Sequence, residues 1–201
     1  MSSKTKNLNF ISVKSRFPIK IGIIGPTNLK KLSRLTGKSI NFFNQKAKEI
    51  GKFLAEIKCE LWVNSDGGMV FNIAKSYKKY GGEKLVILYP LKGEPWPKNH
   101  AKPFRKYGDK VRMEPNWFWT NYNVVSLTDL CICAGLSAGT LSELAYIKWD
   151  CKLKCGRLKK LIAIRELLRD KRLPPEIEVD IKNKLFYIDK VDDLKNVVRL
   201  S

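Results

Sequence analysis

The hydrophobic residues of this chain fall into short unbroken runs that are separated by longer amphipathic segments. The runs lie at residues 20–24, 61–63, 85–89 and 130–134, and none of them alternates with polar residues. Strands of this kind are buried on both faces, as in a parallel sheet. The pattern therefore predicts a single Rossmann-like, doubly wound α/β domain, with helices on both faces of a mainly parallel sheet.

The segments between the runs place hydrophobic residues three or four positions apart, which is typical of helices. This spacing predicts helices over residues 39–58 and 117–127, and another that follows the turn at 65–68 and ends near Tyr80. Residues 158–168 fit either a fifth strand or a helix. A last strand at 186–188 and a last helix at 191–200 complete the expected elements.

The two ends of the expected domain differ in composition from its middle. Residues 1–18 are polar and basic, and we expect a flexible arm with a short strand near residues 10–13, followed by one nucleotide-binding domain at 19–201. Residues 91–116 are rich in Pro, Lys and aromatic residues, and a connection of that length predicts a long loop or lid.

Basic and aromatic side chains alternate in this predicted lid. Trp96, Lys98 and Arg105 are therefore candidates for closing over a ligand or stacking on its base. The three rings at 117–119 could instead pack on the sheet edge or on a dimer partner.

Three glycine-containing turns follow predicted strands, at residues 25–28, 65–68 and 135–139. In an open parallel sheet, ligands bind at the carboxyl ends of the strands where the strand order reverses. If the order is 3-2-1-4-5, the first and third of these turns face each other across one crevice. A turn that enters a helix offers free N–H groups and the positive end of the helix dipole, which suits phosphate.

These turns supply most of the candidate phosphate contacts, and none matches the dinucleotide fingerprint or the Walker A lysine loop. The candidates are Gly25, Thr27, Asn28, Gly67, Gly68, Ser137, Gly139 and Thr140.

The net charge and the cysteine positions indicate which ligands and binding partners the chain favours. A net charge of +20 favours a nucleotide or a nucleic acid as partner, although the basic residues are spread over the whole chain. Cys131 and Cys133 fall on one face of a predicted strand, where packing is the simpler interpretation, so no metal site is expected. No apolar run approaches the roughly 20 residues of a membrane span, and we expect a cytoplasmic protein without a membrane partner.

Four motifs in order, IGIIGPTN, NSDGGMVFNIAKS, ILYP and AGLSAGTLSELAY, lie within residues 20–149. Together they resemble the superfamily of the LONELY GUY phosphoribohydrolases, also called lysine decarboxylase-like or SLOG proteins. Its members include a molybdenum-cofactor carrier protein and DNA-processing protein A. The resemblance implies a Rossmann-like fold that binds a nucleotide or a nucleotide-like phosphate ligand, needs no further cofactor, and forms homodimers or larger assemblies.

The family motif GGxGTxxE aligns with residues 136–143, where Gly139, Thr140 and Glu143 match and the leading glycines are replaced. The resemblance makes Glu143 a candidate catalytic residue that acts on the ribose side of the N-glycosidic bond. From the residues alone, Thr140 and Glu143 also fit a capping box, in which Glu143 would only bind a helix-end N–H.

The chain departs from the family pattern in two further places, at the residue before Asn121 and at Asp66. Asn121 matches the second residue of an Arg-Asn pair found in one branch of the family, but the arginine is absent, and Arg105 or Arg112 of the predicted lid could supply that charge. Asp66 stands where the family usually has glycine, either beside the phosphate crevice or as a helix N-cap.

The sequence thus favours a nucleotide-binding protein, whose enzymatic form would be a weak or altered phosphoribohydrolase. The alternatives are a single-stranded nucleic-acid-binding module that resembles DNA-processing protein A, a protein that resembles a molybdenum-cofactor carrier, and a homo-oligomeric scaffold with a vestigial crevice.

Overall fold

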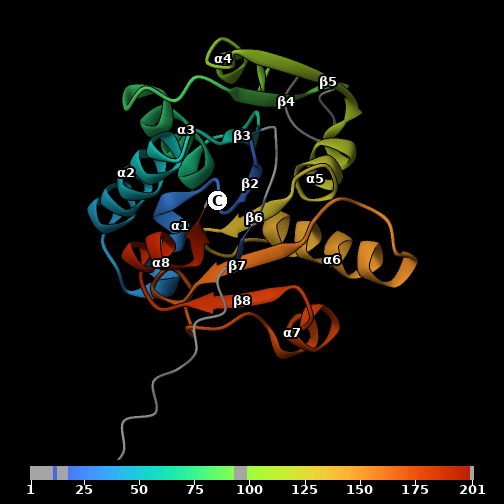
Figure 1. Cartoon of the computed structure of the whole chain (residues 1–201). Coiled ribbons are helices and arrows are strands. Elements are labelled where there is room, and N and C mark those ends of the chain that lie inside the picture. Colours follow the sequence, from blue (N-terminus) through green and yellow to red (C-terminus); the bar gives the residue numbers. More distant parts are fainter. Residues whose placement is uncertain (1–10, 13–17, 93–98, 200–201) are drawn as a thin grey trace, which may run out of the picture.

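The computed structural model describes residues 11–12, 18–92 and 99–199, which fold around a seven-stranded parallel sheet (Figure 1). Its order is β5-β4-β3-β2-β6-β7-β8, and each neighbouring pair is parallel. The strands are β2 (Lys20–Ile24), β3 (Glu60–Asn64), β4 (Leu85–Lys92), β5 (Lys110–Asn116), β6 (Leu130–Cys133), β7 (Lys160–Ile164) and β8 (Leu185–Ile188). The predicted fold class is confirmed.

The strand order reverses between β2 and β6. From β2 the chain adds β3, β4 and β5 on one side, and then returns to place β6, β7 and β8 on the other. In the register of this central pair, Ile24 at the end of β2 lies opposite Cys133 at the end of β6. The first five predicted strands correspond to β2, β3, β4, β6 and β7, and the order expected for them is therefore confirmed. The turns that follow β2 and β6 leave the sheet side by side.

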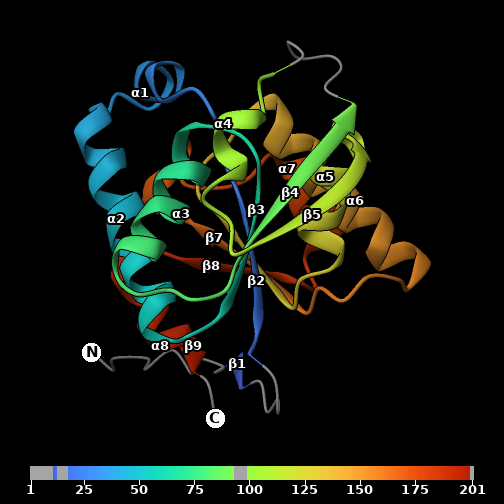
Figure 2. The same ribbon diagram turned by 90° about the horizontal axis from the view of Figure 1, so that it is seen from above.

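Helices cover both faces of the sheet (Figures 1 and 2). The larger core packs α2 (Ile40–Glu56), α3 (Gly68–Lys79) and α8 (Leu194–Val197) against one face, and the other core packs α5 (Trp117–Ser126), α6 (Ala138–Leu153) and α7 (Pro175–Ile181) against the opposite face. Alternate strand residues point into the two cores: Ile21 and Ile23 into the first, Ile24 into the second.

Residues 110–116, which were predicted to lie in the long connection, instead form the edge strand β5, and a short helix α4 (Lys102–Arg105) precedes it. The strand was missed because most of its side chains are exposed, as on a sheet edge, and charged residues and Pro115 interrupt any hydrophobic run.

Two other elements differ from the expected ones, and the alternative of a strand within residues 158–168 is confirmed over that of a helix. A helix α1 (Leu29–Thr36) follows the first turn and was not predicted. Residues 158–168 contain the strand β7 and a 3₁₀ turn, Arg165–Leu167. The expected last helix is reduced to a 3₁₀ turn, Val191–Asp193, and to α8.

The two ends of the described chain meet in a small parallel pair outside the main sheet. Strand β1 (Ile11–Ser12), which corresponds to the expected strand near residues 10–13, pairs with β9 (Val198–Arg199). The rest of the predicted arm, at residues 1–10 and 13–17, lies outside the described residues. Across the described helices, none combines the length and apolarity that crossing a membrane requires.

Gly68 joins two of the predicted turns by close contact. Its φ is +65°, a Cβ built on it would lie 2.4 Å from the carbonyl oxygen of Pro26, and the next residue, Met69, donates its N–H to that oxygen. The start of α3 therefore sits directly on the turn that follows β2, and only glycine fits at this contact.

We predict that Gly68→Ala lowers the free energy of unfolding by at least about 3 kcal/mol, from backbone strain together with the clash. Gly37→Ala is the matched control, because Gly37 also has a positive φ (70°) but nothing within 4 Å of a built Cβ. It should cost only about 1 kcal/mol. Urea unfolding measures both variants, and equal losses would contradict the close contact.

Candidate ligand-binding site at the reversal of strand order

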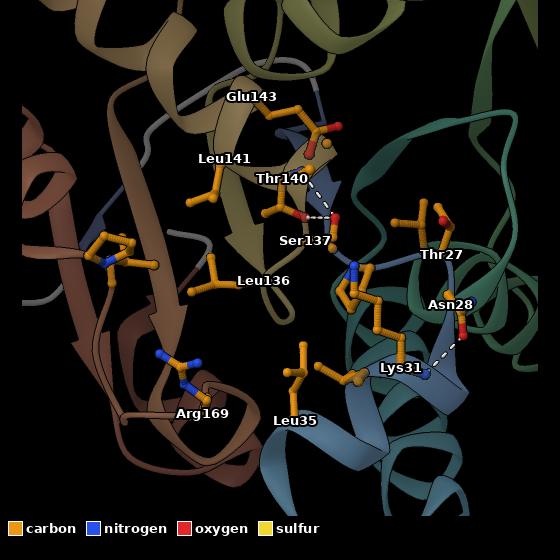
Figure 3. Close-up of a pocket in the computed structure, with 18 of the residues that line it drawn as sticks. Thr27, Asn28, Lys31, Leu35, Leu136, Ser137, Thr140, Leu141, Glu143 and Arg169 are labelled. Atoms are coloured by element: carbon orange, nitrogen blue, oxygen red, sulfur yellow. Dashed lines mark hydrogen bonds between the residues drawn. The ribbon is translucent and has the colours of Figure 1, made fainter. Parts of the chain in front are cut away.

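A cavity of about 1030 Å³ opens where the strand order reverses (Figure 3). Its walls come from the turn after β2 with α1, from the turn after β6 with α6, and from residues 169–175. Eight of the predicted site residues line it: Gly25, Thr27, Asn28, Asn121, Ser137, Gly139, Thr140 and Glu143. The fold therefore brings the first and third glycine turns to one cavity.

The N-terminus of α6 presents free backbone donors to this cavity. Ser137 is the N-cap, and its Oγ accepts the N–H of Thr140 at 3.2 Å. The N–H groups of Ala138 and Gly139 come before the first helical hydrogen bond and have no partner within the helix. A Cβ built on Gly139 would meet only Ser137 Oγ, at 3.8 Å, so the approach to these donors is open.

The N-terminus of α1 lies across the cavity from α6. Asn28 caps it, because its Oδ1 accepts the N–H of Lys31 at 2.9 Å (Figure 3). Lys31 and the exposed Thr27 line the cavity. Among the residues that the structure describes, no carboxylate lies within 4 Å of the Lys31 ammonium group. Two helix N-termini and an unpaired cation thus face the same space, which favours an anion there.

The polar floor of the cavity is a buried cluster of three side chains. Asn64, at the end of β3, donates from Nδ2 to Glu143 Oε1 and to Asn121 Oδ1, at 2.9 Å in each case. Its own Oδ1 is buried and has no hydrogen-bond partner among the described residues. A buried acceptor without a partner is costly, so this atom destabilises the fold unless a donor pairs with it.

Glu143 is only 5% exposed, and burial raises the pKa of its carboxyl well above the usual range. The negative charge of Asp66 raises this pKa further. The alternative role of Glu143 in a capping box is wrong, since its carboxyl binds Asn64, and Ser137 caps the helix.

Asp66 lines the same cavity without capping a helix. The N-cap of α3 is Gly67, whose N–H donates to Asp66 Oδ1 at 2.6 Å, so the interpretation of Asp66 as N-cap is wrong. The same oxygen lies 2.9 Å from His100 Nε2. This pair ties the segment before α4 to the turn after β3.

The remaining predicted residues lie elsewhere. Gly67 and Gly68 are not among the residues that line the cavity, and Gly68 serves the contact with Pro26. The guanidinium of Arg105 stacks over Tyr89, 5.4 Å from the ring centroid, and does not reach the cavity lining. Trp96 and Lys98 lie outside the described residues.

The cations that line the cavity were not found from the sequence. Arg112 pairs with Glu114 on the edge strand, and the positive charge at the cavity comes from Lys31, Arg169 and Arg172. The signal for Lys31 was present in Asn28, a preferred N-cap residue three positions before it. The arginines lie in irregular chain after β7, and no sequence pattern places them at the site.

Aliphatic side chains form the other wall of the cavity. Leu35 from α1, Leu136 and Leu141 at the start of α6, and Leu173 before α7 all line it (Figure 3). Leu35 and Leu141 are exposed to solvent in this state. The cavity thus joins an anion-binding end and a polar floor to an aliphatic wall, which suits an amphipathic small molecule.

Within the described residues, no group of three or more His, Cys, Asp or Glu side chains could hold a metal ion. Cys131 and Cys133 are fully buried in the strand β6, as the packing interpretation expects, and burial raises the pKa of both thiols, to about 12 for Cys133.

The fold and the cavity define a Rossmann-like protein with a ligand-sized site at the reversal of strand order. No protein-family model matches the sequence, and no curated protein matches it. Solved structures do match. The molybdenum cofactor binding protein from Rippkaea orientalis aligns with a TM-score of 0.64 at 17% identity, over 90% of this chain and 96% of that one.

Two further structures show the same fold. The molybdenum cofactor carrier protein from Chlamydomonas reinhardtii aligns with a TM-score of 0.59 at 15% identity, over 88% of this chain and 92% of that one. DNA processing protein A from Helicobacter pylori, described with a single-stranded DNA binding mode, aligns with a TM-score of 0.57 at 15% identity. The alignment covers 89% of this chain and 79% of that one. At the level of fold, these similarities confirm the resemblance inferred from the sequence motifs.

We predict that Glu143→Gln stabilises the protein at neutral pH. A carboxyl with a raised pKa in the folded state stabilises the fold below its unfolded pKa, and this contribution is lost as pH rises towards the folded value. Glutamine keeps the acceptor for Asn64 without this cost. The advantage of the variant in urea unfolding should therefore grow as pH rises from about 4 to 8. A difference that stays constant over this range would contradict the raised pKa.

Proposed function

We propose that this protein binds a nucleotide, or a nucleotide-like phosphate ligand, in the cavity between α1 and α6. The observation that carries the proposal is the convergence of two helix N-termini and Lys31 on a cavity whose floor holds a buried acceptor without a partner. Each feature alone is common. Their combination in one cavity is what a phosphate joined to a hydroxyl-bearing group requires.

The ligand is oriented by the order of these features along α6. Its phosphate lies at the N–H groups of Ala138 and Gly139, with Lys31 opposite. Glu143 is one helical turn further along, so a hydroxyl next to the phosphate reaches the cluster of Glu143 and Asn64. The remaining part of the ligand lies against the aliphatic wall.

The named ligands of the structural neighbours support this class of ligand. Two of the neighbours are named for molybdenum cofactor and one for single-stranded DNA. We rank a free nucleotide first because the cavity lining that offers an anion-binding end also includes the polar residues Asn64 and Glu143, which suit a ribose hydroxyl. A ligand of the molybdenum-cofactor type is the second candidate, since it would occupy the same phosphate position.

We also propose that the protein is a homodimer that associates through α5 and α6. Phe118 and Trp119 on α5 and Trp149 and Leu153 on α6 are exposed. Tyr122 contacts both Trp119 and Tyr146 through ring edges, and so joins the two helices into one aromatic surface. Exposed aromatic surfaces of this kind mark protein interfaces.

The binding test uses Gly139→Asp. An acidic residue in the first turn of α6 is favourable for the helix but places a negative charge at the phosphate position. We expect AMP to raise the melting temperature of the wild-type protein, and this variant to keep its own stability but bind AMP at least about tenfold more weakly. Ser39→Asp is the control, because it adds the same charge at the N-cap of α2, outside the cavity lining. Equal AMP binding by both variants would contradict the assigned phosphate position.

Hydrolysis is tested separately from binding. A protonated Glu143 beside the sugar can donate a proton or a hydrogen bond as the glycosidic bond breaks. If the protein is a phosphoribohydrolase, it releases ribose 5-phosphate from AMP, and Glu143→Gln abolishes release while AMP still binds. Release that persists in this variant would remove Glu143 from the reaction.

The dimer is tested by sedimentation. We expect the wild-type chain to sediment at twice the mass of the chain, and Trp149→Glu to sediment as a monomer. Val179→Glu is the control, because Val179 is an exposed aliphatic residue on α7. Because each copy carries a net charge of +20, the dimer should tighten as salt increases. A monomeric wild-type protein at high salt would rule out this interface.

A further inference from the structure

A second, smaller cavity of about 410 Å³, an open depression in the surface, lies next to the edge strand β8. It is lined by Arg165, Arg172, Glu178, Lys182, Leu185 and Tyr187. Arg172 also lines the main cavity, so one side chain borders both spaces.

The second cavity carries an excess of positive charge. Its one lining carboxylate, Glu178, is already bound by Arg172, with Nε at 3.1 Å, and by the hydroxyl of Tyr187. These bonds lower the pKa of Glu178 against the opposing effect of its burial. Lys182, by contrast, has no carboxylate within 4 Å in the part of the chain that the structure describes. Lys182 is therefore an unpaired cation at this cavity, as Lys31 is at the main cavity.

Two of the three positive groups of this cavity, Arg165 and Arg172, are held in place before any ligand binds. The guanidinium of Arg165 lies 3.9 Å from the ring centroid of Tyr187, and its Nη1 donates to the carbonyl oxygen of Lys171 at 2.8 Å. The hydroxyl of Tyr187 accepts the N–H of Leu173 at 2.8 Å. Because Leu173 lines the main cavity, this network also ties the two spaces together. Preorganised donors lose little entropy when they bind an anion.

We infer that the second cavity is a second phosphate subsite, and that the ligand of the main cavity is a linear dinucleotide with two phosphate groups. The inference rests on the proposed function for its first phosphate. The main cavity alone, at about 1030 Å³, slightly exceeds the range of about 300–1,000 Å³ for small-ligand pockets, which leaves room for more than a mononucleotide. Arg172 lies between the two phosphates and uses Nε and Nη2 for Glu178, so Nη1 stays available.

The test compares AMP with the 5′-phosphorylated dinucleotide pApA by calorimetry. We expect pApA to bind at least about tenfold more tightly than AMP, and Lys182→Met to remove about that factor for pApA while AMP binding is unchanged. Lys75→Met is the matched control, because Lys75 is exposed on α3 and lines neither cavity. It should leave both affinities close to those of the wild-type protein.

The outcomes separate this inference from the proposed function. The second subsite is overturned if AMP binds and pApA binds no more tightly than AMP. It is also overturned if Lys75→Met weakens pApA binding as much as Lys182→Met does. In both cases the first phosphate position stands. If neither ligand binds, both are overturned. A 5′-phosphorylated ten-residue oligonucleotide shows whether the ligand is a nucleic-acid strand or a free dinucleotide. If the oligonucleotide binds more tightly than pApA and this binding depends on Lys182, the subsite is supported with a strand as ligand. If the two bind equally, the subsite is supported with the free dinucleotide as ligand.

Discussion

The parallel pairing of β2 with β6 is the constraint on which the ligand site depends. It sets Ile24 opposite Cys133 at the point where strand order reverses, so the two following turns leave the sheet together. Each turn enters a helix, and the N-termini of α1 and α6 therefore face one cavity. A one-residue shift in this register would turn the side chains of one strand to the opposite face of the sheet and separate the turns.

The polar floor of the cavity lowers the stability of the protein without a ligand. A buried carboxyl and a buried amide oxygen without a partner both cost free energy in the absence of a ligand. Glu143 and Asn64 supply these groups; Glu143 lies about one helical turn from the start of α6, and Asn64 bonds to it from the end of β3. Under the proposed function, a ligand that pairs with these groups offsets this cost.

The sequence predicted those parts of the structure that depend on burial and on turn chemistry. Strands buried on both faces and the turns at 25–28 and 135–139 are encoded locally, so the fold class, the order of the first five predicted strands and eight of the residues that line the cavity could be predicted. The edge strand β5 could not, because most of its side chains are exposed and its residues resemble those of a loop. Arg169 and Arg172 reach the cavity only through the path of the chain after β7, a tertiary effect without a local pattern.

The measurement that tests the account most directly is a crystal structure of the protein grown with AMP. The account predicts that the phosphate lies within hydrogen-bond distance of the N–H groups of Ala138 and Gly139, with a ribose hydroxyl on Glu143 or Asn64. AMP bound at any other surface, or a cavity that stays empty at saturating AMP, would contradict it.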